Sequence, residues 1–471
     1  MSKRAWLRWL VPGPALLLAA MAAAQNQPTE KLDRMYQEAV ADYESGRYQK
    51  AAAVLEGLVP YAPRSYEIHE LLGMAYVSLS ENDKAINHLK LAVQMKPDSA
   101  AGRTNLGTIL FHTGKAALAS EQFREALKLE PESFDANHNL GEFYIHTNNI
   151  SQAAPLLERA RQIDPASYDN SYDLAMADFL LGRFDAARQI VTELVKTRDS
   201  GELHNLMGQI QEKDGKFVDA ANQFEMAAHM DPSEQNLFDW GGEMMLHRTY
   251  EAAIAVYQEG VKRYPDSPRL EIGLGLALYS RGKYDDAVAA LLKAADLDPT
   301  DARCYLFLSK AYNSSPLQAD DVLLRFRRYA ELKPRDALAQ YYYAISLWKG
   351  KRTSDSDVDP QTVEALLLKA IALDDTVADA HVQLGSLYAD QHNYEKSIPQ
   401  YERALQLDEN LSDAHYRLGT DLVHVGQKDR AQKEFAIYQK LRAEHLAEVD
   451  KERAEVKQFV YETRAAGTAK P

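Results

Sequence analysis

The residues best suited to metal binding or catalysis are three histidines and a glutamate at short spacing. His138, Glu142 and His146 follow one another at intervals of four residues, and His112 precedes them. Residues four apart on an α-helix share one face, so these side chains are expected to lie together. Imidazole and carboxylate groups are zinc ligands, and a metal-dependent enzyme is the chemistry that such a set could support.

The spacing also argues against one shared ion. Residues eight apart lie about 12 Å apart along a helix axis, too far for His138 and His146 to bind one metal by themselves. We therefore expect no metal and no cofactor, and interpret the histidines as pH-sensitive lining of a binding surface. The chain has no phosphate-binding loop or nucleophile elbow, and its single cysteine, Cys304, is expected to be a packed residue. The sequence predicts a protein that is not an enzyme.

The elements that must hold these side chains follow a repeat of about 34 residues. Proline stops one helix and resets the chain direction, while a glycine in the middle of each unit ends a helix in a left-handed residue. A small residue, a turn glycine and a proline recur in this order at Gly107, Gly114 and Pro131 and again at Gly275, Gly282 and Pro299. The proline slot is occupied in turn by Pro63, Pro97, Pro131, Pro165, Asp199, Pro232, Pro265, Pro299, Pro334, Asp375 and Glu409.

This pattern resembles the tetratricopeptide repeat, and twelve units can be phased from residue 31 to residue 443. The resemblance implies an all-α fold, an α-solenoid of about twelve antiparallel helix pairs that forms a right-handed superhelix. It also implies that the first helix of each pair lines a concave groove. Each pair has too little core to be stable alone, so neighbouring pairs are expected to share one interior.

The side chains that this resemblance projects into the groove are mostly polar. Asn105 and Asn139 occupy equivalent slots, similar to the asparagine ladder of O-linked N-acetylglucosamine transferase, whose amides hold an extended peptide backbone. The alternative is that both amides bond locally or to solvent. Carboxylates on the same face favour a basic or neutral partner protein or peptide. The candidate groove residues are Asn105, His112, His138, Asn139, Glu142, His146, Asp169 and Asp173.

Several segments depart from the repeat. The units between residues 301 and 375 are irregular, and residues 349–360 are expected to form an inserted surface loop. The two defects suggest a hinge, with simple loop drift as the alternative. Residues 436–466 are expected to form a C-terminal capping helix, and residues 467–471 a disordered tail.

The first 24 residues predict export. Basic residues precede an apolar stretch and a run of alanines, which is typical of a secretory signal, and residues 25–30 form a short segment before the repeats. A periplasmic or secreted location follows, with an uncleaved N-terminal anchor as the alternative. Removal of residues 1–24 changes the formal net charge from −15 to about −18, which argues against nucleic acid and anionic membrane surfaces as direct partners. No direct membrane insertion is expected after cleavage.

These expectations favour a non-catalytic scaffold or adaptor that binds a partner protein or an extended peptide in the groove. The alternative is a structural component of a cell-envelope complex that exports or assembles polysaccharide or protein. A metal-dependent enzyme is the least favoured hypothesis, since it depends on the histidine cluster alone.

Overall fold

The computed structural model describes residues 26–314, 318–353 and 359–445, and all regular elements in these ranges are helices. The predicted signal segment, residues 1–24, and the predicted tail, residues 467–471, lie outside the described residues. Within the described ranges, consecutive helices form twelve pairs, which confirms the all-α fold built from helix pairs. The handedness of the superhelix stays a prediction.

Each pair consists of a first helix and a second helix. The first helices are α1 (Asn26–Glu44), α3 (Tyr66–Ser78), α5 (Ala100–His112), α7 (Phe134–His146), α9 (Tyr168–Leu180), α11 (Gly201–Lys213), α13 (Glu234–Leu246), α15 (Pro268–Ser280), α17 (Ala302–Ser314), α19 (Ala337–Thr353), α21 (Ala378–Asp390) and α23 (Ser412–His424). The second helices are α2 (Tyr48–Leu58), α4 (Asn82–Met95), α6 (Ala116–Leu129), α8 (Ile150–Ile163), α10 (Phe184–Thr197), α12 (Phe217–Met230), α14 (Tyr250–Arg263), α16 (Tyr284–Leu297), α18 (Ala319–Leu332), α20 (Pro360–Leu373), α22 (Tyr394–Leu407) and the helix of residues 428–445.

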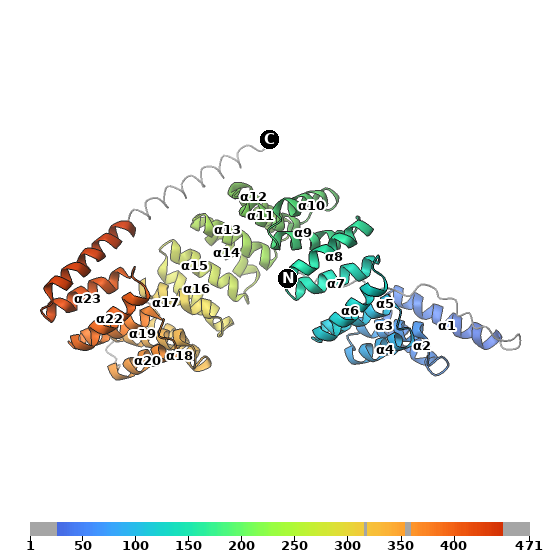
Figure 1. Ribbon diagram of the computed structural model, residues 1–471, viewed down its shortest axis with the longest axis horizontal. Coiled ribbons are helices and arrows are strands. Elements are labelled where there is room, and N and C mark those ends of the chain that lie inside the picture. Colours follow the sequence, from blue (N-terminus) through green and yellow to red (C-terminus); the bar gives the residue numbers. More distant parts are fainter. Residues whose placement is uncertain (1–25, 315–317, 354–358, 446–471) are drawn as a thin grey trace. The chain divides into compact units, whose positions relative to one another are not determined.

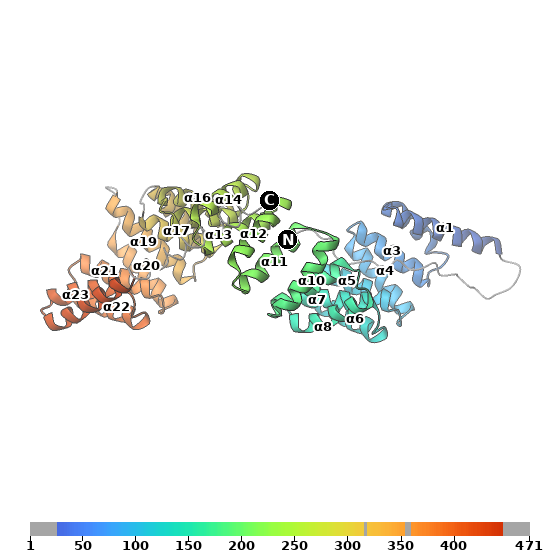
Figure 2. The ribbon, with the colours of Figure 1, turned by 90° about the horizontal axis from the view of Figure 1, so that it is seen from above.

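The chain divides after Asp199 into two compact units. Within each unit, helices adjacent in the sequence lie side by side (Figure 1 and Figure 2). First helices of successive pairs also contact each other directly, as α3 does α5 and α11 does α13, whereas contact between second helices is largely confined to α16 and α18. The first helices therefore form a closely packed row on one face of each unit.

Glycine shapes the turn between the two helices of many pairs. Gly114 and Gly282 have φ angles of 75° and 84°, in the left-handed region that glycine enters without steric cost. Where the slot lacks glycine the backbone still adopts this conformation, as at Ser80 and His392 with φ of 62° and 59°. The predicted left-handed turn is therefore confirmed, and the repeat imposes it even on residues with a Cβ atom.

A second kind of glycine lies where the two helices of a pair touch. A Cβ atom on Gly107 of α5 would stand 2.8 Å from the Phe123 ring of α6, and one on Gly275 of α15 would stand 2.5 Å from Leu291 of α16. Phe123 and Leu291 are buried core residues. The second helix thus fills the space that the missing side chain of the first helix leaves.

Two polar features tie many of the pairs to the loop before them. Serine hydroxyls cap first helices by accepting a hydrogen bond from the third helical N–H, as Ser99 does from Gly102. Histidines bridge two elements: in α21, the Nδ1 atom of His381 lies 2.8 Å from Gln400 of α22 and its Nε2 lies 3.2 Å from the Asp375 carbonyl. The serine caps are Ser65, Ser99, Ser133, Ser167, Ser233 and Ser267.

The structure refines the predicted irregular segments. The helix α18 has regular length, yet it contacts α17 much less than second helices elsewhere contact their first helices. The helix α19 continues to Thr353, so residues 349–353 of the expected loop are helical. The described part of the expected cap, residues 436–445, continues the last second helix, and residues 446–466 lie outside the described residues. The hinge stays a prediction.

The contact between Gly107 and Phe123 makes a testable prediction. We expect Gly107→Ala to lower the free energy of unfolding by about 1–3 kcal/mol, because the new methyl group overpacks the buried ring. Urea denaturation followed by circular dichroism measures this change.

The helical glycine Gly57 provides the matched control, since nothing lies within 4 Å of the Cβ that alanine would add there. Gly57→Ala is expected to stabilise the chain by up to about 1 kcal/mol through helix propensity. Equal effects of both substitutions would contradict a close approach at Gly107.

Candidate functional site

The first helices of the first unit carry a strong excess of negative charge. Their only basic side chain apart from histidine, in α3, α5, α7 and α9, is Arg103, and it is occupied: its guanidinium donates to the Pro97 carbonyl at 2.9 Å and to Gln122 at 3.1 Å. The acidic residues of these four helices are Glu67, Glu70, Asp135, Glu142, Asp169, Asp173 and Asp178.

The second helices of the same unit have the opposite tendency. In α4, α6, α8 and α10, lysines and arginines outnumber the carboxylates. Their basic residues are Lys84, Lys90, Arg124, Lys128, Arg159, Arg161, Arg188 and Lys196. Charge is therefore separated between these two sets of helices, and the row formed by α3, α5, α7 and α9 is a negatively charged face, here called the acidic face.

The predicted histidine cluster is centred on Glu142 of α7. His138 and His146 place their Nε2 atoms 4.0 and 3.8 Å from its two carboxylate oxygens. His138 is buried and its ring stacks on Phe134. Its Nδ1 atom lies 3.2 Å from Oδ1 of Asn170 on α9, so a contact from the next pair orients the ring. The cluster is thus a set of neighbouring side chains on α7, as the four-residue spacing predicts.

His112 of α5 joins this cluster electrostatically. Burial lowers the pKa of His112, the carboxylate of Glu142 opposes that shift and His146 adds to it. Even so, these four side chains do not bring three ligand atoms close enough together for one metal ion, since the described residues contain only one such set and it lies elsewhere.

The two asparagines lie deeper than an open ladder would place them. Asn105 and Asn139 are 1% and 0% exposed. The Asn105 amide donates to Glu70 of α3 at 3.2 Å, and the Asn139 amide donates to the Asp135 carbonyl one turn earlier at 2.7 Å. Each amide therefore has a partner within the fold, and its contact with a bound peptide stays a prediction.

The two predicted aspartates of α9 are more accessible. Asp169 is exposed in the first turn of the helix, and Asp173, one turn further on, is partly exposed. Asp178, in the last turn, is buried and pairs with Arg183 at 3.3 Å. Asp169 and Asp173 are consequently the members of the acidic face on α9 that solvent or a partner can reach.

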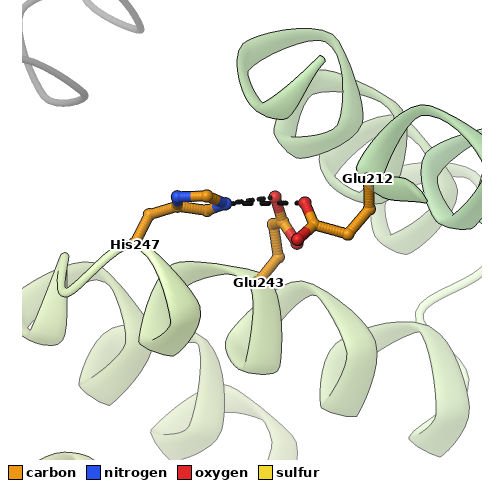
Figure 3. Close-up of side chains that lie close together, drawn as sticks. All are labelled: Glu212, Glu243 and His247. Carbon is orange, nitrogen blue, oxygen red and sulfur yellow. Dashed lines mark ion pairs between the residues drawn. The ribbon is translucent and has the colours of Figure 1, made fainter. Parts of the chain in front are cut away.

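One cluster in the second unit was not predicted. Glu212 lies near the end of α11, Glu243 in the last turn of α13, and His247 directly after α13 (Figure 3). His247 Nε2 lies 3.1 Å from Glu243 Oε1 and 3.5 Å from Glu212 Oε2. In the part of the chain that the structure describes, this is the set of metal-ligating groups that converges, with one ligand atom of each within 4.8 Å of the others.

The protonation of this cluster reflects its burial and charge. Burial raises the pKa of Glu243, and Glu212 adds to the rise while His247 opposes it. Burial by itself would lower the pKa of His247, but pairing with Glu243 and Glu212 outweighs this effect and the pKa is raised.

The sequence offered one signal for this cluster, the spacing of Glu243 and His247 by four residues. Glu212 comes close to them only through the packing of α11 against α13.

Two other expectations concern reactivity and membranes. Cys304 is buried in α17, and burial raises the pKa of its thiol to about 12, which agrees with a packed residue rather than a nucleophile. Among the described helices, none has both the length and the apolar character that a membrane span requires.

Comparison with known proteins shows repeats of one family along most of the described chain. Models described as Tetratricopeptide repeat match residues 36–100, 104–168, 150–210, 247–302 and 378–411. Four of these five matches begin or end within a few residues of helix-pair boundaries in the structure.

Individual relatives are distant. DnaJ homolog subfamily C member 3 from Gallus gallus is 27% identical over 104 residues, and the match spans 22% of this chain and 21% of that protein. The Cut9–Hcn1 hetero-tetramer of APC/C is similar with a TM-score of 0.40 and 14% identity, covering 92% of this chain and 97% of that one. Yeast Tom70 gives a TM-score of 0.38 with 14% identity and the same coverage.

Glu70 makes the second testable prediction. Burial raises its pKa from 4.5 to about 7, so the folded chain binds this proton more tightly than the unfolded chain does. The free energy of unfolding should therefore fall as the pH rises from about 4.5 to about 7, by up to about 3 kcal/mol from this group. Glu70→Gln removes that contribution and should be more stable than the unchanged chain at pH 8.

Urea denaturation at pH 5 and pH 8 measures this difference. The exposed Glu121 of α6 supplies the control, because Glu121→Gln should leave the pH dependence as it is. If Glu70→Gln and the unchanged chain lose the same stability between pH 5 and pH 8, the pKa of Glu70 is not raised by burial.

Proposed function

Because the chain belongs to the tetratricopeptide-repeat family, we propose that it is a non-catalytic scaffold that binds a partner protein through the acidic face of its first unit. The observation that carries this proposal is the charge separation between helix rows. Seven carboxylates lie on α3, α7 and α9, five of them at least partly exposed, and the single arginine of this row, on α5, already donates hydrogen bonds within the fold. A surface of one sign attracts segments of the opposite sign and raises their rate of association.

The partner that fits this face is a basic, extended segment of another protein. Lysine and arginine side chains can pair with the accessible carboxylates of α9, while the partly exposed imidazole of His146 offers a further polar contact. Asn105 and Asn139 support the face from beneath, since their amides bond to Glu70 and to the backbone of α7. In this proposal the asparagines position the carboxylate face, and direct contact with the peptide backbone is secondary.

The location proposed for this scaffold is outside the cytoplasm. The basic and apolar pattern of residues 1–24 supports export, to the periplasm or to the exterior. An acidic face on an exported scaffold suits basic segments of envelope or secreted proteins. A structural role in an envelope assembly is the alternative, and it would place the contacts on the second helices.

The third testable prediction uses the accessible carboxylates of α9. The double substitution Asp169→Asn and Asp173→Asn should weaken binding of an extended lysine- and arginine-rich peptide about tenfold, since each exposed pair contributes roughly 0.2–1 kcal/mol. Fluorescence anisotropy of the labelled peptide at low and at physiological salt measures the change. Binding should weaken with salt, because exposed charges are screened.

The matched control removes the same charge from the other row of helices. Glu121 and Glu125 are also four residues apart, on the second helix α6, so Glu121→Gln with Glu125→Gln changes the net charge equally. Equal weakening by both double substitutions would refute the acidic face as the binding surface. Cross-links to a native partner that concentrate on second helices would favour the assembly role instead.

A further inference from the structure

The cluster of Glu212, Glu243 and His247 joins two neighbouring pairs of the second unit. Glu212 belongs to α11, whereas the other two side chains come from the end of α13, and all three point toward one small region (Figure 3). Their side chains are 23%, 1% and 14% exposed. The cluster therefore lies mostly within the row of first helices and retains limited access to solvent.

The spacing of the ligand atoms matches the coordination shell of a small cation. Four ligands at zinc distances of about 2.0–2.2 Å are separated from each other by roughly 3.4 Å when arranged as a tetrahedron. His247 Nε2 lies 3.1 Å from Glu243 Oε1 and 3.5 Å from Glu212 Oε2. These two separations are those of tetrahedron edges, with the fourth corner left to water or to a donor from a partner.

Two of the facing oxygens have unused hydrogen-bonding capacity. Glu243 Oε1 and Glu212 Oε2 are buried, and neither accepts a hydrogen bond of good geometry from a residue that the structure describes; His247 Nε2 is their ion-pair partner. Glu243 as a residue is 2% exposed, so water cannot readily satisfy it. A buried carboxylate oxygen whose hydrogen bonding is incomplete is costly, and both oxygens face His247 within the cluster.

Charge balance also favours a divalent cation. Two carboxylates with one imidazolium leave a net negative charge in a mostly buried place, which burial penalises. Two carboxylates, a neutral imidazole and a divalent ion are neutral together. The imidazole selects against calcium and magnesium, which prefer shells of oxygen alone, and suits zinc.

We propose that Glu212, Glu243 and His247 bind one zinc ion that braces α11 against α13. The ion links side chains of successive pairs, so it stabilises the packing of the first helices in the second unit. The Phe217 ring at the start of α12, 4.7 Å from the His247 ring, covers one side of the imidazole. The zinc site is separate from the acidic face of the first unit and does not depend on it.

The test uses the purified intact chain without an affinity tag, freed of metal with a chelator and dialysed. Titration with zinc chloride in a calorimeter at pH 7.5 should show one high-affinity site per chain, and zinc should raise the melting temperature. His247→Gln and Glu212→Gln should each weaken zinc binding on the order of 100-fold or more, since loss of a direct ligand exceeds the loss of an outer-shell partner.

His229 provides the matched control. It is an exposed histidine of α12 that lies 3.6 Å from Glu225, so it forms a similar ion pair without a third ligand. His229→Gln should leave zinc affinity and the zinc-induced rise in melting temperature unchanged. Calcium chloride at the same concentration should not bind at the site.

Four results would overturn the proposal: no stoichiometric zinc in the unchanged chain, undiminished binding in His247→Gln and Glu212→Gln, an equal loss in His229→Gln, or equally tight calcium binding. The first would identify the cluster as an ion pair only. Circular dichroism in chelator establishes that each variant is folded. If His247→Gln does not fold, Glu212→Gln decides the question, because that side chain is the most exposed of the three.

Discussion

The close approach of the two helices in each pair is the constraint on which the structure depends. At Gly107 and Gly275 a single methyl group would collide with the facing ring or leucine, so the second helix packs against bare backbone. Buried residues such as Phe123 and Leu291 then fill the interface within a pair, and first helices pack against the first helices of neighbouring pairs. Stability is thereby distributed along the repeats, each supported by its neighbours.

Packing the first helices into one row has consequences for polar side chains. Groups that project from one first helix meet the next, so Asn105 bonds to Glu70 of the preceding pair and His138 reaches Asn170 of the following one. In the first unit this row collects carboxylates on α3, α7 and α9. In the second unit the same kind of contact brings Glu212 beside His247. The same kind of packing thus gives a charged face in one unit and a mostly buried polar cluster in the other.

The candidate site was predictable where it depends on spacing within one helix. The intervals of four residues place His138 and His146 on either side of Glu142, as the structure shows. The depth of Asn105 and Asn139 was not predictable, because a side chain in that slot is covered or open according to the helix beside it. The convergence of Glu212 with His247 was missed for the same reason, since it joins separate pairs.

The amino-acid sequence by itself determined the helix pairs, their left-handed turns and the excess of acidic residues in the first helices. These features depend on backbone preferences and side-chain types within a few residues, which a repeated pattern reveals. Only the tertiary structure decided which polar groups are buried and which approach each other between pairs. That outcome depends on how each first helix is rotated against its neighbour, a geometry that many distant contacts set together and that no short stretch of sequence encodes.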